Sequence, residues 1–140
     1  MNKKLSGTDI FEYTVVSKGF FRLGERKAVP AESFQGKKIL AFCGIARPQR
    51  FQSLLEQEDI QPEAFLKFPD HHAYPHSSLQ KIKEFCQTIK AEAAITTEKD
   101  TVKIAHSHFL EHIPIYFLKI DLAVEKKFYS RITRFTQSLS

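Results

Sequence analysis

From residue 37 onward, short continuous apolar runs alternate with segments in which apolar residues recur every three or four positions. Continuous apolar runs are typical of strands buried on both faces of a sheet, whereas the three-to-four spacing is typical of helices that pack on such a sheet. Because the two patterns alternate, they predict an α/β fold with three layers, in which a small, mostly parallel sheet lies between helices. Strands are expected near residues 38–43, 64–68, 93–97 and 115–120.

Local signals indicate where the helices begin. Pro48 suits the first position of a helix, because proline lacks the N–H that this position leaves unpaired. Ser77 or Ser78 is expected to cap a second helix, and Thr97 a short third helix. The last segment predicts a C-terminal helix, since four apolar residues fall on one stripe: Phe128, Ile132, Phe135 and Leu139.

The first 36 residues have a different pattern. Residues 10–16 and 20–23 are rich in β-branched and aromatic side chains, and a glycine-containing segment separates them. Two such runs around a glycine predict a β-hairpin. We therefore expect residues 1–36 to form a hairpin and connector outside the main core, and residues 37–140 to form the α/β domain.

Composition narrows the class of protein. The chain has 140 residues, of which 42% are apolar, enough for one domain with a core. No apolar run approaches a membrane-spanning length, and the N-terminus lacks the apolar region of a secretory signal. Cys43 and Cys86 are far apart, so a disulfide framework and a four-cysteine zinc site are excluded, and both are expected to be core residues. A reducing, cytoplasmic environment fits these features.

The net charge of +5 is concentrated at the two ends of the chain. Residues 1–30 carry six Lys or Arg against three acids, residues 119–140 carry five against two, and the segment between them carries ten against eleven. Basic ends suit a polyanion or an anionic membrane surface. The alternative is that they are solvated faces that maintain solubility, because no block of five like charges occurs.

Three polar segments each follow the end of an expected strand. They are residues 44–48, 69–74 and 97–100. In a parallel sheet the strands end at the same edge, and open α/β sheets bind ligands beyond that edge. The three segments are therefore expected to meet at one rim, which is the place where chemistry is most expected.

The candidate catalytic residues in this rim are Asp70, His71 and His72. Histidine can move a proton near neutral pH, and an adjacent carboxylate can fix its tautomer. The alternative is a loop in which Asp70 makes a turn hydrogen bond and the histidines are solvated. No metal site is expected, since a third ligand is not assured near the other histidines, which are His76, His106, His108 and His112.

Basic side chains near the same rim are candidates for binding a substrate or a phosphate: Arg47, Arg50, Lys99 and Lys103. Each also has an ordinary surface interpretation, and the segment that begins at Thr97 resembles a capping box with Asp100 at its third position. The sequence contains neither G-x-x-x-x-G-K-[ST] nor G-x-G-x-x-G, so no usual loop for the phosphates of a nucleoside triphosphate is present. The chain is therefore not expected to be an ATP-using enzyme by itself.

Four blocks, taken together, resemble the C-terminal half of the tetraacyldisaccharide 4'-kinase (lipid A 4'-kinase) family of Gram-negative bacteria. The blocks lie at residues 36–45, 48–51, 68–74 and 96–103. The resemblance implies an enzyme that transfers the ATP γ-phosphate to the 4'-hydroxyl of the lipid A disaccharide precursor. It further implies a P-loop domain that holds ATP and Mg²⁺, and a two-stranded linker to a smaller α/β domain. His71 or His72 would assist a catalytic aspartate of the P-loop domain.

The resemblance also sets expectations for partners and location. The partners would be the P-loop domain of the same kinase, the anionic lipid A precursor and the cytoplasmic face of the inner membrane, with no nucleic acid. Because the chain lacks the P-loop, it is expected to be incomplete and inactive alone, with no cofactor of its own. Two alternatives remain: a stand-alone module that binds an anionic sugar, a lipid head group or a protein partner, and a structural domain without a ligand.

Overall fold

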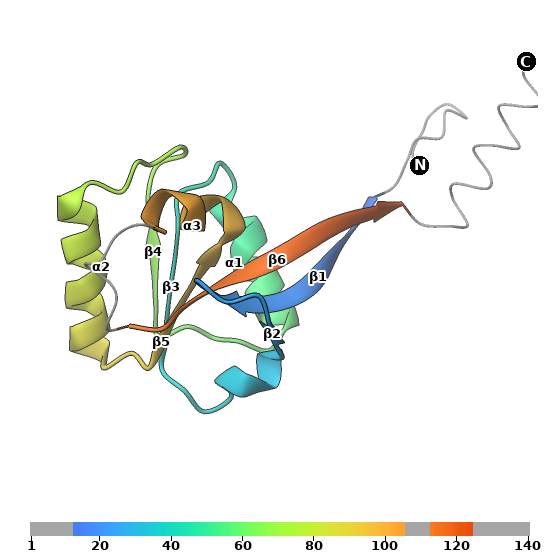
Figure 1. Cartoon of the computed structure of the whole chain (residues 1–140), viewed down its shortest axis with the longest axis horizontal. Helices are drawn as coiled ribbons and strands as arrows, with labels where there is room; N and C mark the ends of the chain where they lie inside the picture. Colours follow the sequence, from blue (N-terminus) through green and yellow to red (C-terminus); the bar gives the residue numbers. More distant parts are fainter. Residues whose placement is uncertain (1–12, 106–112, 125–140) are drawn as a thin grey trace, which may run out of the picture. The chain divides into compact units, whose positions relative to one another are not determined.

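In a computed structural model of the chain, the backbone is described for residues 13–105 and 113–124, and side chains for residues 19–105 and 113–119. The described part contains a six-stranded mixed sheet of order β2-β1-β6-β5-β3-β4, with helices packed on it (Figure 1). The elements are β1 (Tyr13–Arg22), β2 (Ala28–Val29), the 3-10 helix η1 (Ala31–Phe34), β3 (Ile39–Cys43), α1 (Pro48–Gln57), β4 (Ala64–Lys67), α2 (His76–Ile89), β5 (Ala93–Thr97), α3 (Glu98–Ile104) and β6 (Ile115–Val124).

The parallel part of the sheet is built around β3. This strand pairs in parallel with β4 on one side and β5 on the other, and β5 pairs in parallel with β6. All five residues of β3 are buried, as expected for an apolar strand covered on both faces. The predicted α/β class and the four predicted strands are confirmed, although β6 continues beyond its expected end to Val124.

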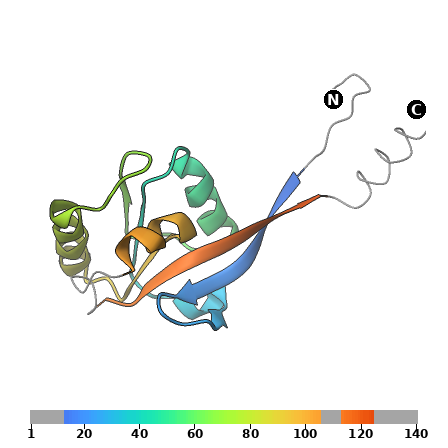
Figure 2. The same cartoon turned by 45° about the horizontal axis from the view of Figure 1, so that its top comes forward.

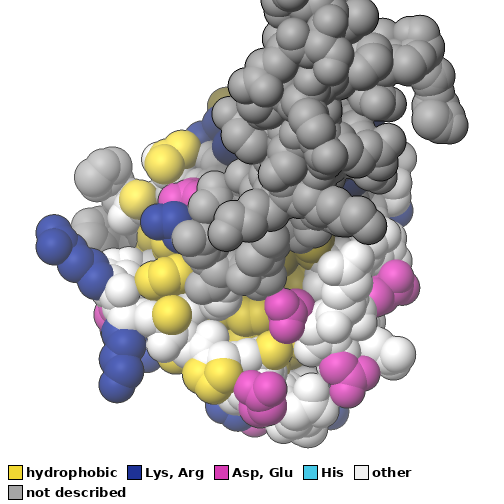
Figure 3. All heavy atoms as spheres, turned by 90° about the vertical axis from the view of Figure 1, so that its right-hand side faces the viewer, with side chains coloured by type: hydrophobic (Ala, Val, Ile, Leu, Met, Phe, Trp, Pro, Cys, Tyr) yellow, Lys and Arg dark blue, Asp and Glu magenta, His cyan; other side chains and the backbone are white. Residues whose placement is uncertain are grey.

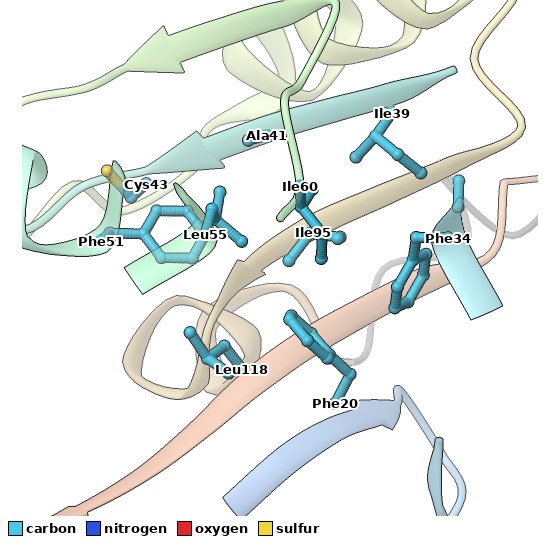
Figure 4. Packing of buried hydrophobic residues seen from close by; sticks show 11 residues of the cluster. Phe20, Phe34, Ile39, Ala41, Cys43, Phe51, Leu55, Ile60, Ile95 and Leu118 are labelled. Carbon is cyan, nitrogen blue, oxygen red and sulfur yellow. The ribbon is translucent and has the colours of Figure 1, made fainter. Parts of the chain in front are cut away.

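Alternate residues of β3 serve two separate core clusters, because successive side chains point to opposite faces of a sheet. Ile39, Ala41 and Cys43 pack with Phe51 and Leu55 of α1 (Figure 4). On the other face, residues of α2 and α3 pack against the strands, and the cluster includes Leu40, Phe42, Ile82, Cys86 and Ile104. Helix α1 therefore covers one face and helices α2 and α3 the other, and Figure 2 shows α1 and α2 on opposite sides of the strands.

The prediction that residues 10–23 form two strands of a hairpin is wrong. Residues 13–22 form the single strand β1, which continues through Gly19 at a φ of +102° instead of turning there. Its neighbours in the sheet are β2, which pairs with it in antiparallel fashion, and β6. Glycine alone tolerates this φ without strain, so the residue that suggested a turn serves an extended strand.

Residues before position 36 also contribute to the core. Phe20 is fully buried and Phe34 nearly so, and their rings meet edge to face with centroids 5.1 Å apart. Figure 4 shows both rings close to the strands of the sheet. The expectation that this segment stays outside the main core is therefore wrong for these two residues, and the domain boundary at residue 36 stays a prediction.

Helix α2 begins earlier than its serines predicted. Its N-cap is Pro75, whose carbonyl accepts hydrogen bonds from the amides of Ser78 and Leu79. Ser77 and Ser78 therefore lie inside the helix, and the hydroxyl of Ser78 is used elsewhere, as described below. Thr97 does cap α3, and Pro48 does begin α1, as predicted.

The chain divides into two compact units. One comprises residues 18–119 and holds both core clusters, and the other comprises residues 1–17 together with 120–140. The described residues of the second unit are 13–17 of β1 and 120–124 of β6. The predicted helix over residues 128–139 and the histidines at 106, 108 and 112 lie outside the described residues.

Candidate functional site

The three polar segments that follow β3, β4 and β5 meet at one edge of the sheet (Figure 1). The meeting point is the carboxylate of Asp100. Its Oδ1 accepts a hydrogen bond of 3.0 Å from the backbone N–H of Gly44 and one of 2.8 Å from the hydroxyl of Tyr74. Each segment thus reaches the same carboxylate, and the predicted rim is present in the structure.

Asp100 is 1% exposed and is held from its own helix as well. The hydroxyl of Thr97 donates to Oδ2 of Asp100, while the backbone N–H of Asp100 donates to the Thr97 hydroxyl. This reciprocal pair is close to the capping box that the sequence predicted. A buried carboxylate is tolerated only where its oxygens are hydrogen-bonded, and here three donors from three segments satisfy it.

Gly44 allows the loops to come this close. A Cβ atom at this position would lie 2.8 Å from the Cβ of His72 and 3.0 Å from the carbonyl oxygen of Pro69. Only glycine fits without displacing the loop that follows β4. The turn after β3 therefore sets the position of the Asp70–Tyr74 loop.

The structure separates the two neighbouring histidines. The ring of His72 stacks on Phe68, with centroids 4.5 Å apart, and meets Tyr74 edge to face at 4.8 Å. Its Nε2 lies 2.6 Å from the hydroxyl oxygen of Ser78. Partial burial is the main cause that lowers the pKa of His72, and the nearby charge of Lys103 lowers it further, against an opposing effect of Asp100. His72 is thus a packed ring that favours the neutral form.

His71 has the opposite environment. Its side chain is 78% exposed, and its Nε2 lies 3.6 Å from a carboxylate oxygen of Asp70. Its backbone has a φ of +61°, a left-handed conformation that non-glycine residues adopt at a cost. Neither imidazole is buried in the core.

The two cysteine thiols and the Tyr74 hydroxyl are poor nucleophiles. Burial, followed by the Asp100 charge, raises the pKa of the Cys43 thiol to about 11, and the same two causes raise that of the Tyr74 hydroxyl. Burial alone raises the pKa of Cys86 to about 11. All three groups are protonated at neutral pH, which supports the structural role expected of the cysteines.

The four basic candidates are all exposed. Arg47 and Arg50 lie at the start of α1, and Lys99 and Lys103 lie on α3. Lys103 is the one whose charge reaches His72. The structure brings Lys103 to the Asp70–Tyr74 loop, while the binding roles of all four residues stay predictions.

The described residues offer no ready metal site. Among them, no three side chains of His, Cys, Asp or Glu converge. Asp100 already accepts from three donors, and Asp70 lies beside His71. The rim as described therefore offers no set of side chains that would hold a metal ion by this chain alone.

Three members of the site do not follow from the local sequence pattern. The pattern predicts a capping box for Asp100 and a helix cap for Ser78, and it predicts no role for Tyr74. A local signal existed for each, but the partners lie 26 and 56 residues away for Asp100, so only the fold reveals them.

Comparison with known proteins gives the family of the chain. A family model described as tetraacyldisaccharide-1-P 4'-kinase (LpxK) matches residues 2–137. The chain belongs to this family. A tetraacyldisaccharide 4'-kinase of Syntrophus aciditrophicus is 39% identical over 90 residues, covering 64% of the chain and 24% of that protein. A relative from Desulfatibacillum aliphaticivorans is 33% identical over 130 residues, covering 86% of the chain and 34% of that protein.

The chain therefore spans only about a quarter to a third of the length of these curated relatives. A solved structure shares its fold: LpxK from Aquifex aeolicus in complex with ATP, with a TM-score of 0.57 at 20% identity, covering 93% of this chain and 38% of that one. No helix in the described part is long and apolar enough to cross a membrane.

Proposed function

We propose that this chain is the C-terminal domain of a tetraacyldisaccharide 4'-kinase and supplies one wall of its active site. The observation that carries the proposal is that three of the four blocks that resemble the family meet at Asp100, which holds the Asp70–Tyr74 loop at the carboxyl edge of the sheet. The match over residues 2–137 supports the same assignment. Substrates bind at this edge in open α/β sheets.

The reaction is the transfer of the γ-phosphoryl group of ATP to the 4'-hydroxyl of the lipid A disaccharide precursor. The hydroxyl oxygen forms the new bond to phosphorus, the bond to the bridging oxygen breaks, and ADP leaves. The hydroxyl proton passes to a base. Phosphoryl transfer depends mainly on positioning and on charge stabilisation at the phosphates. The residues that position the phosphates and stabilise their charge, together with Mg²⁺, belong to the P-loop domain. This chain is therefore inactive alone.

Within this chain, His71 is the histidine that assists proton transfer. Its exposed ring can face a substrate or a second domain, and the carboxylate of Asp70 lies beside it. His72 instead packs against Phe68 and Tyr74 and keeps its Nε2 beside Ser78. His72 therefore stabilises the loop, and Asp70 orients the ring that acts.

A chimera tests this proposal. The matching segment of the Syntrophus aciditrophicus kinase is replaced by this chain, and ATP-dependent phosphorylation of the tetraacyldisaccharide 1-phosphate is measured. We expect activity in the chimera and none in the 140-residue chain alone. General acid–base assistance contributes roughly 10²–10⁴-fold in rate, so His71→Ala should lower kcat by a factor in that range without lowering the melting temperature.

His72→Ala is the matched control in the same chimera. Loss of its stacking and of its contact with Ser78 should lower the melting temperature, with little loss of rate per folded molecule. An inactive chimera that binds ATP would contradict the kinase assignment. The reverse pattern, with His72→Ala impairing kcat and His71→Ala impairing stability, would contradict the assignment of His71.

A further inference from the structure

We infer that Asp100 is a positioning residue that fixes the Asp70–Tyr74 loop, and with it His71, through the hydroxyl of Tyr74. The inference rests on the proposed function for its catalytic consequence. Its structural part stands on the geometry alone. The carboxylate joins the turn after β3, the loop after β4 and the cap of α3 in one buried junction.

The loop needs such an anchor because its backbone is strained at both ends of the segment that carries the histidines. His71 has a φ of +61° and Tyr74 a φ of +58°. Left-handed conformations in non-glycine residues persist where the surroundings hold them. Tyr74 is one of these two residues, and its side-chain hydroxyl donates a hydrogen bond of 2.8 Å to the buried Asp100 carboxylate.

The aromatic contacts of Tyr74 connect this anchor to the histidine segment. Its ring meets the rings of Phe68 and His72 edge to face, with centroids 5.4 Å and 4.8 Å away. His72 in turn packs so closely on Gly44 that a side chain at position 44 would collide with it. The loop thus packs on Gly44 and Asp100, and the backbone N–H of Gly44 donates a hydrogen bond of 3.0 Å to the Asp100 carboxylate. A shift of Tyr74 would move the backbone that presents His71.

Tyr74→Phe tests the inference, because it removes one hydroxyl and keeps the ring that packs on Phe42 and Phe68. In the ¹⁵N-labelled 140-residue chain, we expect the amide resonances of residues 70–73 and the ring protons of His72 to shift. The matched control is Tyr116→Phe, whose ring packs on Phe34 in the other core cluster. The control should leave these resonances in place.

In the kinase chimera, Tyr74→Phe should lower kcat roughly tenfold, because small misplacements of a reacting group are costly, and should leave the KM for ATP unchanged. Gly44→Ala, which pushes on His72 and Pro69 directly, should give the same split with a larger loss. A purely structural role predicts a loss only in proportion to the unfolded fraction, which a melting curve measures.

The two proposals fail in different ways. Unchanged loop resonances in Tyr74→Phe, or equal changes in Tyr116→Phe, would overturn the positioning role whatever the chimera does. Shifted loop resonances with an undiminished kcat in an active chimera would overturn the link from Asp100 to His71. An inactive chimera with the native loop would contradict the proposed function alone, and the resonances would still decide the anchor.

Discussion

Asp70 and Asp100 are two aspartates of the same rim, and their surroundings give them different roles. The Asp70 carboxylate is 39% exposed and faces the open ring of His71. Asp100 is sealed beneath the loops, and its oxygens accept from a backbone amide and two hydroxyls. An exposed acid can orient a group that moves a proton, whereas a buried and saturated acid holds segments together.

His72 should make the stability of the domain depend on pH. Its pKa lies below the ordinary 6.5 when the chain is folded, so the unfolded chain binds the proton more readily. Stability then rises with pH wherever the unfolded state holds more protons. This contribution is complete above the unfolded pKa and is lost as the pH falls towards the folded one.

The expected result is that the native chain loses more unfolding free energy than His72→Gln between about pH 7.5 and about pH 5.5. Urea unfolding at the two pH values measures it, and His71→Gln, which changes the exposed ring, is the control. An equal loss in the native chain and in His72→Gln would show that another group carries the dependence.

At the scale of elements, the sequence predicted what depends on local pattern. The apolar run of β3, the proline that begins α1 and the hydroxyl that caps α3 are all signals carried by neighbouring residues. The errors came where a local signal has two uses. Gly19 suits a turn or an extended strand, and Ser78 suits a cap or a contact with His72, and tertiary packing decides between them.

Thr97, the N-cap of α3, should contribute more to the free energy of unfolding than an ordinary surface residue does. Thr97→Ala removes the acceptor for the Asp100 amide and one of the donors to the Asp100 carboxylate. Loss of an N-cap hydroxyl typically costs about 1 kcal/mol. Because Thr97→Ala also removes a donor to a buried carboxylate, we expect a larger loss of unfolding free energy. Thr97→Ser, which keeps the hydroxyl, should retain most of it.

Ser77→Ala is the matched control in α2. Its side chain is exposed at the second position of the helix, and no side chain caps α2. Such surface substitutions usually change stability by less than about 0.5 kcal/mol. Urea unfolding of the three variants decides the matter. A loss in Ser77→Ala as large as that in Thr97→Ala would mean that the cap has no special contribution.

At the scale of the whole molecule, charge is distributed by sequence position. The described part of the face in Figure 3 carries Lys and Arg side chains as well as Asp and Glu, with hydrophobic side chains between them. The excess of positive charge instead belongs to residues 1–30 and 119–140. If an anionic membrane attracts this protein by charge, the attraction should therefore come mainly from residues 1–30 and 119–140.

The last prediction concerns that attraction. The proposed function implies a lipid substrate and therefore contact with an anionic bilayer, and each basic residue near such a surface contributes about 1 kcal/mol. Replacing Lys126, Lys127 and Arg131 with Gln should weaken binding to anionic vesicles by roughly 10²-fold. Binding of the native chain should also fall steeply as salt rises from about 0.05 to about 0.5 M, because screening shortens the range of the attraction.

Replacing the exposed Lys37, Lys38 and Lys67 changes the net charge by the same amount and should have a much smaller effect. Vesicle sedimentation at both salt concentrations measures the two variants beside the native chain. Equal weakening in both would attribute binding to net charge alone, and binding unaffected by salt would show that the attraction is not electrostatic.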